Sequence, residues 1–189
     1  MKKKSISTKL GDTGKTNLLY GGRVRKSTLR VEAYGCGDEA ISALGMARAL
    51  SRDKWIKEKI FDVQKEMFIV NTELASDPKH LDTLKKHFPV VTKEMTKNIE
   101  TLLGQLENKM TLPKSFVIPG GSPASAALDI ARTAIRKTER RFVELTGNGN
   151  WKRSEIGPYL NRLSDYVFML ARYEDRNLPY EALTGESGE

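Results

Sequence analysis

Hydrophobic residues recur along this chain at the three- and four-residue spacing of amphipathic α-helices. The clearest pattern runs from Ile56 to Leu74 and ends at Ser76-Asp77-Pro78. An earlier pattern runs from Asp38 to Leu50, and a third follows Pro89 and extends to Met110. We therefore predict three helices in the first 110 residues. The methionines at 67, 95, 110 and 169 fall on apolar faces and are interpreted as core packing.

A fourth helix is predicted from Ser122, which stands at an N-cap position before Pro123, to Gly147-Asn148-Gly149. A fifth follows Pro158 and places Leu160, Leu163, Val167 and Leu170 on one face. Five helices joined by short loops, with hardly any alternating segment, predict an all-α fold, a five-helix bundle.

The fourth helix carries a charged stripe beside its apolar face. Arg132, Arg136, Glu139 and Arg140 fall within an arc of roughly 100°. Three guanidiniums arranged in this way could bind a polyphosphate through paired N–H donors. A charged stripe is more often a solvated helix face, and the stripe alone leaves both interpretations open.

The composition bounds the class of protein. The chain has 189 residues, enough for one domain with its own core, and its net charge of +8 favours an anionic partner. A nucleotide, a nucleic acid and an acidic membrane surface all meet that description. The single cysteine, Cys36, excludes an internal disulfide. No apolar run approaches the roughly 20 residues of a membrane span. Polar residues follow the basic start Met1-Lys2-Lys3-Lys4, so a cytoplasmic location is expected.

Residues 1–30 show glycine-rich loop signals and little hydrophobic period. Gly14-Lys15-Thr16 resembles the end of a P-loop, but position 9 is lysine where that motif needs glycine, and no apolar strand precedes it. A P-loop kinase is therefore rejected. Closely spaced glycine amides and Lys9, Lys15 and Lys26 could still bind phosphate, and a basic N-terminal arm is the alternative. His80 and His87 lack partners at ligand spacing, so no protein-borne metal site is expected.

Six short blocks, in order over residues 7–173, together resemble the PduO-type ATP:corrinoid adenosyltransferases. They are Thr8-Lys9-x-Gly11-Asp12-x-Gly14-x-Thr16, Gly22-Arg23-Val24-x-Lys26, Arg30-Val31-Glu32-Ala33-Tyr34-Gly35 leading to Asp38-Glu39, Pro119-Gly120-Gly121, Arg132-x-x-x-Arg136-x-x-Glu139-Arg140-Arg141, and Leu160-Asn161-Arg162-Leu163-Ser164-Asp165. Each block alone is weak, whereas the ordered set is specific.

The resemblance implies a homotrimer of five-helix bundles with active sites between subunits. The implied reaction is attack of cob(I)alamin on C5′ of ATP, which gives adenosylcobalamin and triphosphate. Mg²⁺ is expected on the ATP phosphates rather than in a protein cage. Residues 1–30 would be a mobile nucleotide-binding loop segment, 31–175 the helical bundle and 176–189 a C-terminal tail. A cob(II)alamin reductase and a B12-dependent acceptor enzyme are implied partners.

The resemblance also implies roles for individual residues. ATP would be bound by Thr8, Lys9, Leu10, Gly11, Thr16, Asn17, Lys26, Arg136, Glu139, Arg140 and Asn161. The residues closest to the reaction would be Arg132, Arg136, Phe116 and Asp38. Arg132 would pair with the partner subunit's Asp38, and Phe116 would close the lower face of the corrin ring and keep water from the cobalt.

Two departures and two alternatives accompany the resemblance. Leu10 stands where the family usually has threonine, and Ala40-Ile41 where it usually has Leu-Asn, near the expected contact between subunits. The alternatives are a basic helical bundle that binds nucleic acid and a non-catalytic cobalamin carrier of the same fold. Against the first, Glu139 interrupts the basic stripe and most aromatic residues occupy core-type positions.

Overall fold

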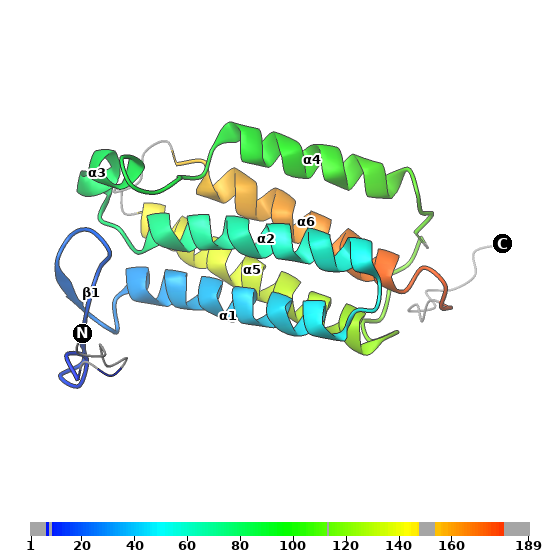
Figure 1. Cartoon of the computed structure of the whole chain (residues 1–189), viewed down its shortest axis with the longest axis horizontal. Helices are drawn as coiled ribbons and strands as arrows, with labels where there is room; N and C mark the ends of the chain where they lie inside the picture. Colours follow the sequence, from blue (N-terminus) through cyan, green and yellow to red (C-terminus); the bar gives the residue numbers. More distant parts are fainter. Residues whose placement is uncertain (1–6, 8, 113, 148–153, 180–189) are drawn as a thin grey trace, which may run out of the picture.

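The computed structural model describes residue 7 and the ranges 9–112, 114–147 and 154–179. Five long helices run alongside one another along the length of the molecule (Figure 1). They are α1 (Leu29–Leu50), α2 (Lys54–Leu74), α4 (Lys93–Glu107), α5 (Pro123–Gly147) and α6 (Ile156–Glu174). The short helices η1 (Pro78–His80) and α3 (Leu81–Lys85) follow α2. Strand β1 (Lys15–Asn17) pairs antiparallel with β2 (Arg23–Arg25) before the bundle begins.

The core forms where the apolar faces of the long helices meet. Helix α1 packs on α2 and α5. Helix α6 packs on α5 and α4. Leu44, Ile60, Ile135 and Leu170, from four different helices, are fully buried there. Met67 and Met169 are buried, while Met95 and Met110 are partly buried against the same core. The prediction of a helical bundle from the hydrophobic spacing is confirmed.

The first helix begins at Leu29, so its predicted start at Asp38 was wrong. Gly35 and Gly37 lie inside it, although glycine costs about 1 kcal/mol in a helix interior. The structure gives a reason for one of them. A Cβ added at Gly37 would lie 1.9 Å from Oδ1 of Asn71 on α2. Glycine at this position therefore leaves room for the Asn71 side chain against α1.

Two other boundaries and the number of helices also differ from the predictions. Helix α6 begins at Ile156, which places Pro158 in its first turn, where backbone N–H groups lack helical acceptors anyway. Helix α4 ends at Glu107, so Met110 lies beyond it. The described residues contain six α-helices rather than five, because residues 81–85 form the extra short helix α3.

The start of α5 at Pro123 is confirmed and has a clear physical cause. The Ser125 amide donates to Ser122 Oγ at 3.2 Å, and the Ser122 amide donates to Ser125 Oγ at 3.1 Å. These reciprocal caps satisfy amides that the first turn leaves without partners. The helix ends at Gly147, and residues 148 and 149 lie outside the described ranges.

The β1–β2 hairpin was not predicted, and it is joined to the end of α2. The Leu19 amide donates to the Ala75 carbonyl at 2.9 Å, and the Asp77 amide donates to the Tyr20 carbonyl at 2.7 Å. The Tyr20 ring lies 6.4 Å, between centroids, from the rings of His87 and Phe88. The base of the N-terminal segment is thus fixed to one end of the bundle.

Glu73 is a buried carboxylate near the same end of the bundle. It accepts hydrogen bonds from the Val91 amide at 3.0 Å and from Ser154 Oγ at 3.2 Å. Burial raises the pKa of Glu73, although both hydrogen bonds act in the opposite direction. The folded state therefore holds a proton on Glu73 more tightly than the unfolded chain does.

Because of this raised pKa, the free energy of unfolding depends on pH in a definite direction. The contribution of Glu73 is fully present below the unfolded pKa near 4.5 and is lost as the pH rises through the folded pKa. Glu73→Gln, which cannot titrate, should therefore gain stability relative to the native chain between about pH 4 and pH 8. Urea unfolding at both pH values measures the difference. Glu58→Gln, an exposed change on the same helix, is the control. An unchanged difference for Glu73→Gln would contradict the assignment.

Candidate active site

A cationic hollow lies at the β1–β2 hairpin. Its volume is about 370 Å³, and its lining comprises Leu10, Gly11, Lys15, Thr16, Asn17, Arg23 and Lys26. Five of these residues belong to the ATP set expected from the sequence. Lys9 precedes them with a left-handed backbone at φ 56°, and Thr8 lies outside the described residues.

Arg23 and Lys26 shape this hollow. The Arg23 guanidinium donates to the Leu10 carbonyl and, at 3.2 Å, to Thr13 Oγ1. A Cβ added at Gly11 would lie 3.0 Å from Lys26 Nζ, so the ammonium group sits directly against the glycine. Three cations and no carboxylate occur among the described residues of the lining. Such an environment favours a polyanion.

The resemblance assigned no role to Lys15 or Arg23, although the sequence named Lys15 among the lysines that could bind phosphate. Both lie in the hairpin, where Thr16 pairs with Val24 and Asn17 with Arg23. Exposed and half-buried positions alternate in both strands, but each strand has only three residues. The alternating pattern was the available signal for the two strands. A pattern of three residues is too short to distinguish a strand from a loop.

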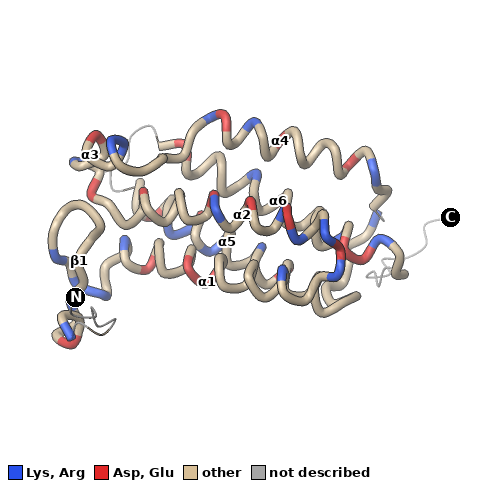
Figure 2. The backbone as a smooth tube through the Cα atoms, in the orientation of Figure 1, with Lys and Arg blue, Asp and Glu red and all other residues tan. Residues whose placement is uncertain are grey.

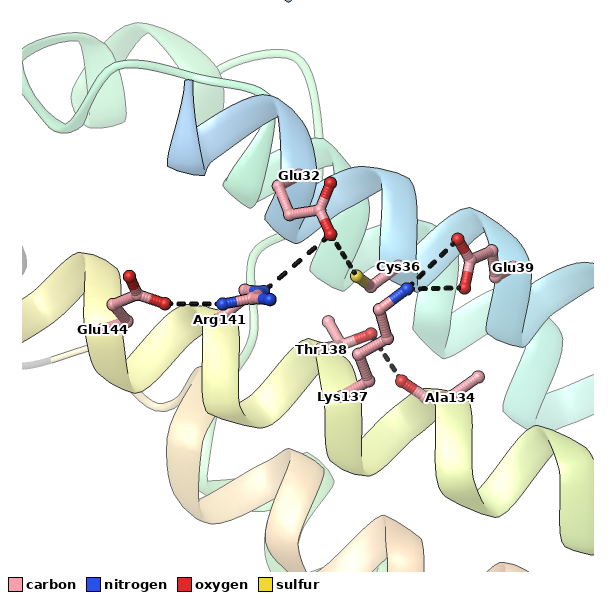
Figure 3. Close-up of polar contacts among 8 residues, drawn as sticks. All are labelled: Glu32, Cys36, Glu39, Ala134, Lys137, Thr138, Arg141 and Glu144. Carbon is pink, nitrogen blue, oxygen red and sulfur yellow. Dashed lines mark hydrogen bonds and ion pairs between the residues drawn. The ribbon is translucent and has the colours of Figure 1, made fainter. Parts of the chain in front are cut away.

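One side of α5 is held to α1 by ion pairs (Figure 3). Lys137 Nζ lies 3.1 Å from Glu39 Oε2, and Arg141 Nε lies 3.8 Å from Glu32 Oε1. The buried Cys36 thiol lies between these pairs, and burial raises its pKa. The basic residues on this side of α5 therefore have structural partners within the chain.

Arg136 and Arg140 are in a different situation. Both are exposed, and neither forms an ion pair or hydrogen bond with any described residue. Beside them, Asn161 Nδ2 on α6 donates to Glu139 Oε1 at 3.1 Å, so these two expected ATP residues meet across two helices. Uncompensated guanidiniums beside an oriented amide are suited to an anionic ligand.

Arg132 is held differently from its two neighbours in the stripe. Its Nε lies 3.0 Å from Asp129 Oδ1, and Arg172 of α6 donates to the other Asp129 oxygen. Asp129 is 5% exposed and Arg172 is 1% exposed, so this is a buried charge cluster that sequence reasoning missed. Asp129 lies three residues before Arg132, which was the available signal. Asp38 is exposed on α1, and its pairing with Arg132 between subunits stays a prediction.

Phe116 lies in the segment that joins α4 to α5, at the opposite end of the bundle from the hairpin (Figure 1). Its side chain is 82% exposed, so the ring is available to a ligand or a neighbouring subunit. Within one chain, the cationic hollow and Phe116 are therefore well separated. Ala40 and Ile41 are buried, so that departure from the family pattern changes the core of the chain.

The described residues show neither a metal-binding cluster nor a membrane-spanning helix. They contain no group of three or more His, Cys, Asp and Glu residues that could hold a metal ion. No helix in the same ranges is both long and apolar enough to cross a membrane.

Residues 6–174 match the family model described as cobalamin adenosyltransferase. The chain belongs to this family. A corrinoid adenosyltransferase from Citrobacter freundii is 40% identical over 90% of this chain and 94% of that protein. The corrinoid adenosyltransferase PduO of Salmonella typhimurium is 35% identical over 90% of this chain, which spans 50% of that longer protein.

Solved structures agree with this membership. A variant PduO-type ATP:corrinoid adenosyltransferase from Lactobacillus reuteri, complexed with cobalamin and ATP, superposes with a TM-score of 0.85. The match covers 95% of this chain and 99% of that one at 28% identity. A second variant complexed with ATP gives a TM-score of 0.83 at 29% identity. The resemblance to the PduO-type enzymes is confirmed.

Proposed function

We propose that this chain transfers the 5′-deoxyadenosyl group of ATP to cob(I)alamin, forming adenosylcobalamin and triphosphate. The observation that carries the proposal is the superposition, over 95% of the chain, on a PduO-type enzyme complexed with cobalamin and ATP. The cationic hollow and the exposed guanidiniums of Arg136 and Arg140, which have no ion pair with a described residue, support it.

The residues fit the chemistry of this transfer. The electron pair of Co(I) forms the Co–C5′ bond, and the C5′–O electrons leave with the triphosphate. Negative charge grows on the leaving group, so fixed cations and amides around it stabilise the transition state. Lys15, Arg23 and Lys26 are suited to this role, with Mg²⁺ on the phosphates. Cobalt is the nucleophile, so the reaction requires no side-chain base.

The assembly we propose is a homotrimer with sites between subunits. The support is the separation of the hairpin from Phe116 within one chain (Figure 1). A neighbouring subunit would bring one chain's hairpin and α5 arginines to the Phe116 segment of another, and Arg132 would face the partner subunit's Asp38. A cytoplasmic location, a cob(II)alamin reductase and a B12-dependent acceptor enzyme complete the proposal.

The direct test is anaerobic. The protein is mixed with chemically reduced cobalamin and Mg-ATP, and the absorbance of Co(I) is followed. We expect it to disappear only when ATP is present, with adenosylcobalamin and triphosphate as products. Protein-dependent loss of Co(I) without ATP, or no loss with ATP, would overturn the proposal.

Nucleic-acid binding is less well supported. Lys and Arg occur together with Asp and Glu on every helix labelled in Figure 2, so acidic residues accompany the basic ones throughout the bundle and would weaken a one-sided basic face. Sequence-independent binding of nucleic acid relies on such a face. Filter binding to duplex and single-stranded DNA at modest salt should therefore show no complex.

Removing the Phe116 ring tests the corrinoid side of the site. Because the ring is 82% exposed, Phe116→Ala should change unfolding free energy by no more than about 0.5 kcal/mol. Turnover should fall by about tenfold or more, since the ring would no longer shield the cobalt from water. Phe68→Ala, which removes another exposed ring on α2, is the control. Unchanged turnover in Phe116→Ala would exclude this role.

The unusual Leu10 offers a test of the nucleotide side. Its carbonyl is already bound by Arg23, and its side chain is exposed without a hydroxyl to offer phosphate. Leu10→Thr should lower the ATP dissociation constant by up to about tenfold, the value of one added hydrogen bond. Leu19→Thr, another exposed leucine of the hairpin, is the control for calorimetric titration. A dissociation constant for Leu10→Thr equal to that of the native chain would contradict this explanation.

A further inference from the structure

Arg132 is anchored within the chain, unlike Arg136 and Arg140 of the same charged stripe. Its Nε donates to Asp129 Oδ1 at 3.0 Å, three residues earlier on α5. The Arg132 side chain is nevertheless 25% exposed. Neither of its terminal nitrogens forms a hydrogen bond or ion pair with any described residue. The guanidinium is thus held at Nε, while its two terminal nitrogens keep their donors for another partner.

Asp129 is itself fixed by the neighbouring helix. Arg172 of α6 donates to its other oxygen, Oδ2. The centroid of the Phe168 ring, one turn earlier on α6, lies 5.2 Å from the guanidinium carbon of Arg172 and 5.9 Å from that of Arg132. Asp129 and Arg172 are 5% and 1% exposed, so little water competes for these contacts. The carboxylate that anchors Arg132 therefore has a defined position relative to two helices.

The charges of this cluster leave Arg132 cationic. Two guanidiniums share one carboxylate, so Asp129 cannot neutralise both of them. Arg172 is the more deeply buried of the two and needs this counter-charge. A guanidinium carries five N–H donors in a fixed fork, so Arg132 can keep Asp129 at Nε and bind a second anionic group with its terminal nitrogens.

We propose that Asp129 is a positioning residue for Arg132 in the adenosyl transfer. The inference rests on the proposed function, in which Arg132 would pair with the partner subunit's Asp38 close to the reacting groups. A free arginine side chain samples many rotamers, and ordering it costs conformational entropy. The bond from Nε to a fixed carboxylate removes much of that freedom before the subunits and substrates meet, so the arginine is preorganised. Asp129 was not among the site residues expected from the sequence.

Arg132→Lys tests the anchoring without altering the buried cluster. Lysine keeps the positive charge, but its single nitrogen cannot hold Asp129 at one atom and a second anion at others, as the fork does. We expect single-turnover kcat to fall by about tenfold or more, nearly as far as in Arg132→Ala. Arg52→Lys, the same change at an exposed arginine between α1 and α2, is the control. A native kcat in Arg132→Lys would show that charge alone is enough and would overturn the proposal.

A double-mutant cycle separates positioning from a structural role. Asp129→Asn removes the charge and should lower kcat by about tenfold or more, as a misplacement of the arginine by about 1 Å does. In the Arg132→Ala background, the same change should alter kcat by no more than about twofold, because the residue that Asp129 positions is gone. Asp62→Asn, the same change at an exposed ion pair on α2, should leave kcat unchanged in both backgrounds.

Three results of the cycle would contradict the proposal. An equal loss of kcat from Asp129→Asn in both backgrounds would show a structural role. A native kcat in Asp129→Asn would show that the anchoring carboxylate has no role in the reaction. A native kcat in Arg132→Ala would remove both residues from the reaction.

The outcomes also separate the positioning role from the function. If the native chain forms adenosylcobalamin and the cycle is additive, only the role of Asp129 is lost. If the native chain forms none, the proposed function fails and this inference fails with it. Calorimetric titration with ATP shows whether Asp129→Asn is folded, since its ATP dissociation constant should stay within about twofold of the native value. If that variant does not fold, the result for Arg132→Lys decides.

Discussion

Arg136→Ala is expected to abolish most turnover while leaving corrinoid binding intact. The Arg136 guanidinium is exposed and has no ion pair with a described residue, so the fold does not depend on it. In the proposed reaction it would face the charge that develops on the triphosphate. Removing one preorganised donor of this kind costs about 10²–10³-fold in kcat. Single-turnover kinetics with cob(I)alamin and saturating Mg-ATP measure the loss.

The matched control is Arg52→Ala, because Arg52 is an exposed arginine in the connection between α1 and α2. It should leave kcat within about twofold of the native value, as expected for a surface site away from the reaction. Arg136→Ala should melt at the native temperature. Equal loss of corrinoid affinity and turnover would assign Arg136 to corrinoid binding instead. A native kcat would remove it from the site, and the non-catalytic carrier would then regain support.

Asp129→Ala is expected to cause a large loss of stability. Asp129 accepts from Arg132 with one oxygen and from Arg172 with the other. Truncation would leave the Arg172 guanidinium, which is 1% exposed, buried without a counter-charge. Breaking a buried pair from one side costs about 3–5 kcal/mol. Urea unfolding measures the change, together with a fall in melting temperature of about 10 °C.

Asp62→Ala provides the comparison. Asp62 pairs with Lys65 at 2.7 Å, but both side chains are more than half exposed. Surface pairs of this kind contribute about 0–1 kcal/mol, so this variant should unfold close to the native chain. If Asp129→Ala lost no more stability than Asp62→Ala, Arg172 would have to be stabilised by something other than Asp129.

The sequence predicted the long helices because their stability comes from apolar residues at regular spacing. The start of α5 was predictable because Ser122 and Pro123 act locally, through one cap and one fixed backbone angle. The start of α1 was not. Gly35 and Gly37 indicate an irregular segment, and only the approach of Asn71 from α2 explains the helix at Gly37. Tertiary packing there outweighs local propensity.

Some residues of the candidate site could likewise be predicted from the sequence, and others could not. Motif order placed Gly11, Lys26 and Asn161 in one family pattern, and the structure puts Gly11 and Lys26 in the lining of a single hollow. Pairing of β1 with β2 brings Arg23 to the same hollow, through strands too short to predict. The buried set of Asp129, Phe168 and Arg172 depends on how α5 crosses α6, which no spacing along either helix records.

The position of the hairpin at one end of the bundle and of Phe116 at the other has a consequence for activity in solution (Figure 1). In the proposed homotrimer, a single chain would hold two halves of different sites, so each catalytic centre would exist only as long as its subunits stay together. Turnover per chain should then decline on dilution while helix content, read by circular dichroism, stays constant. Dissociation of the subunits would therefore abolish turnover while every helix of the chain stays folded.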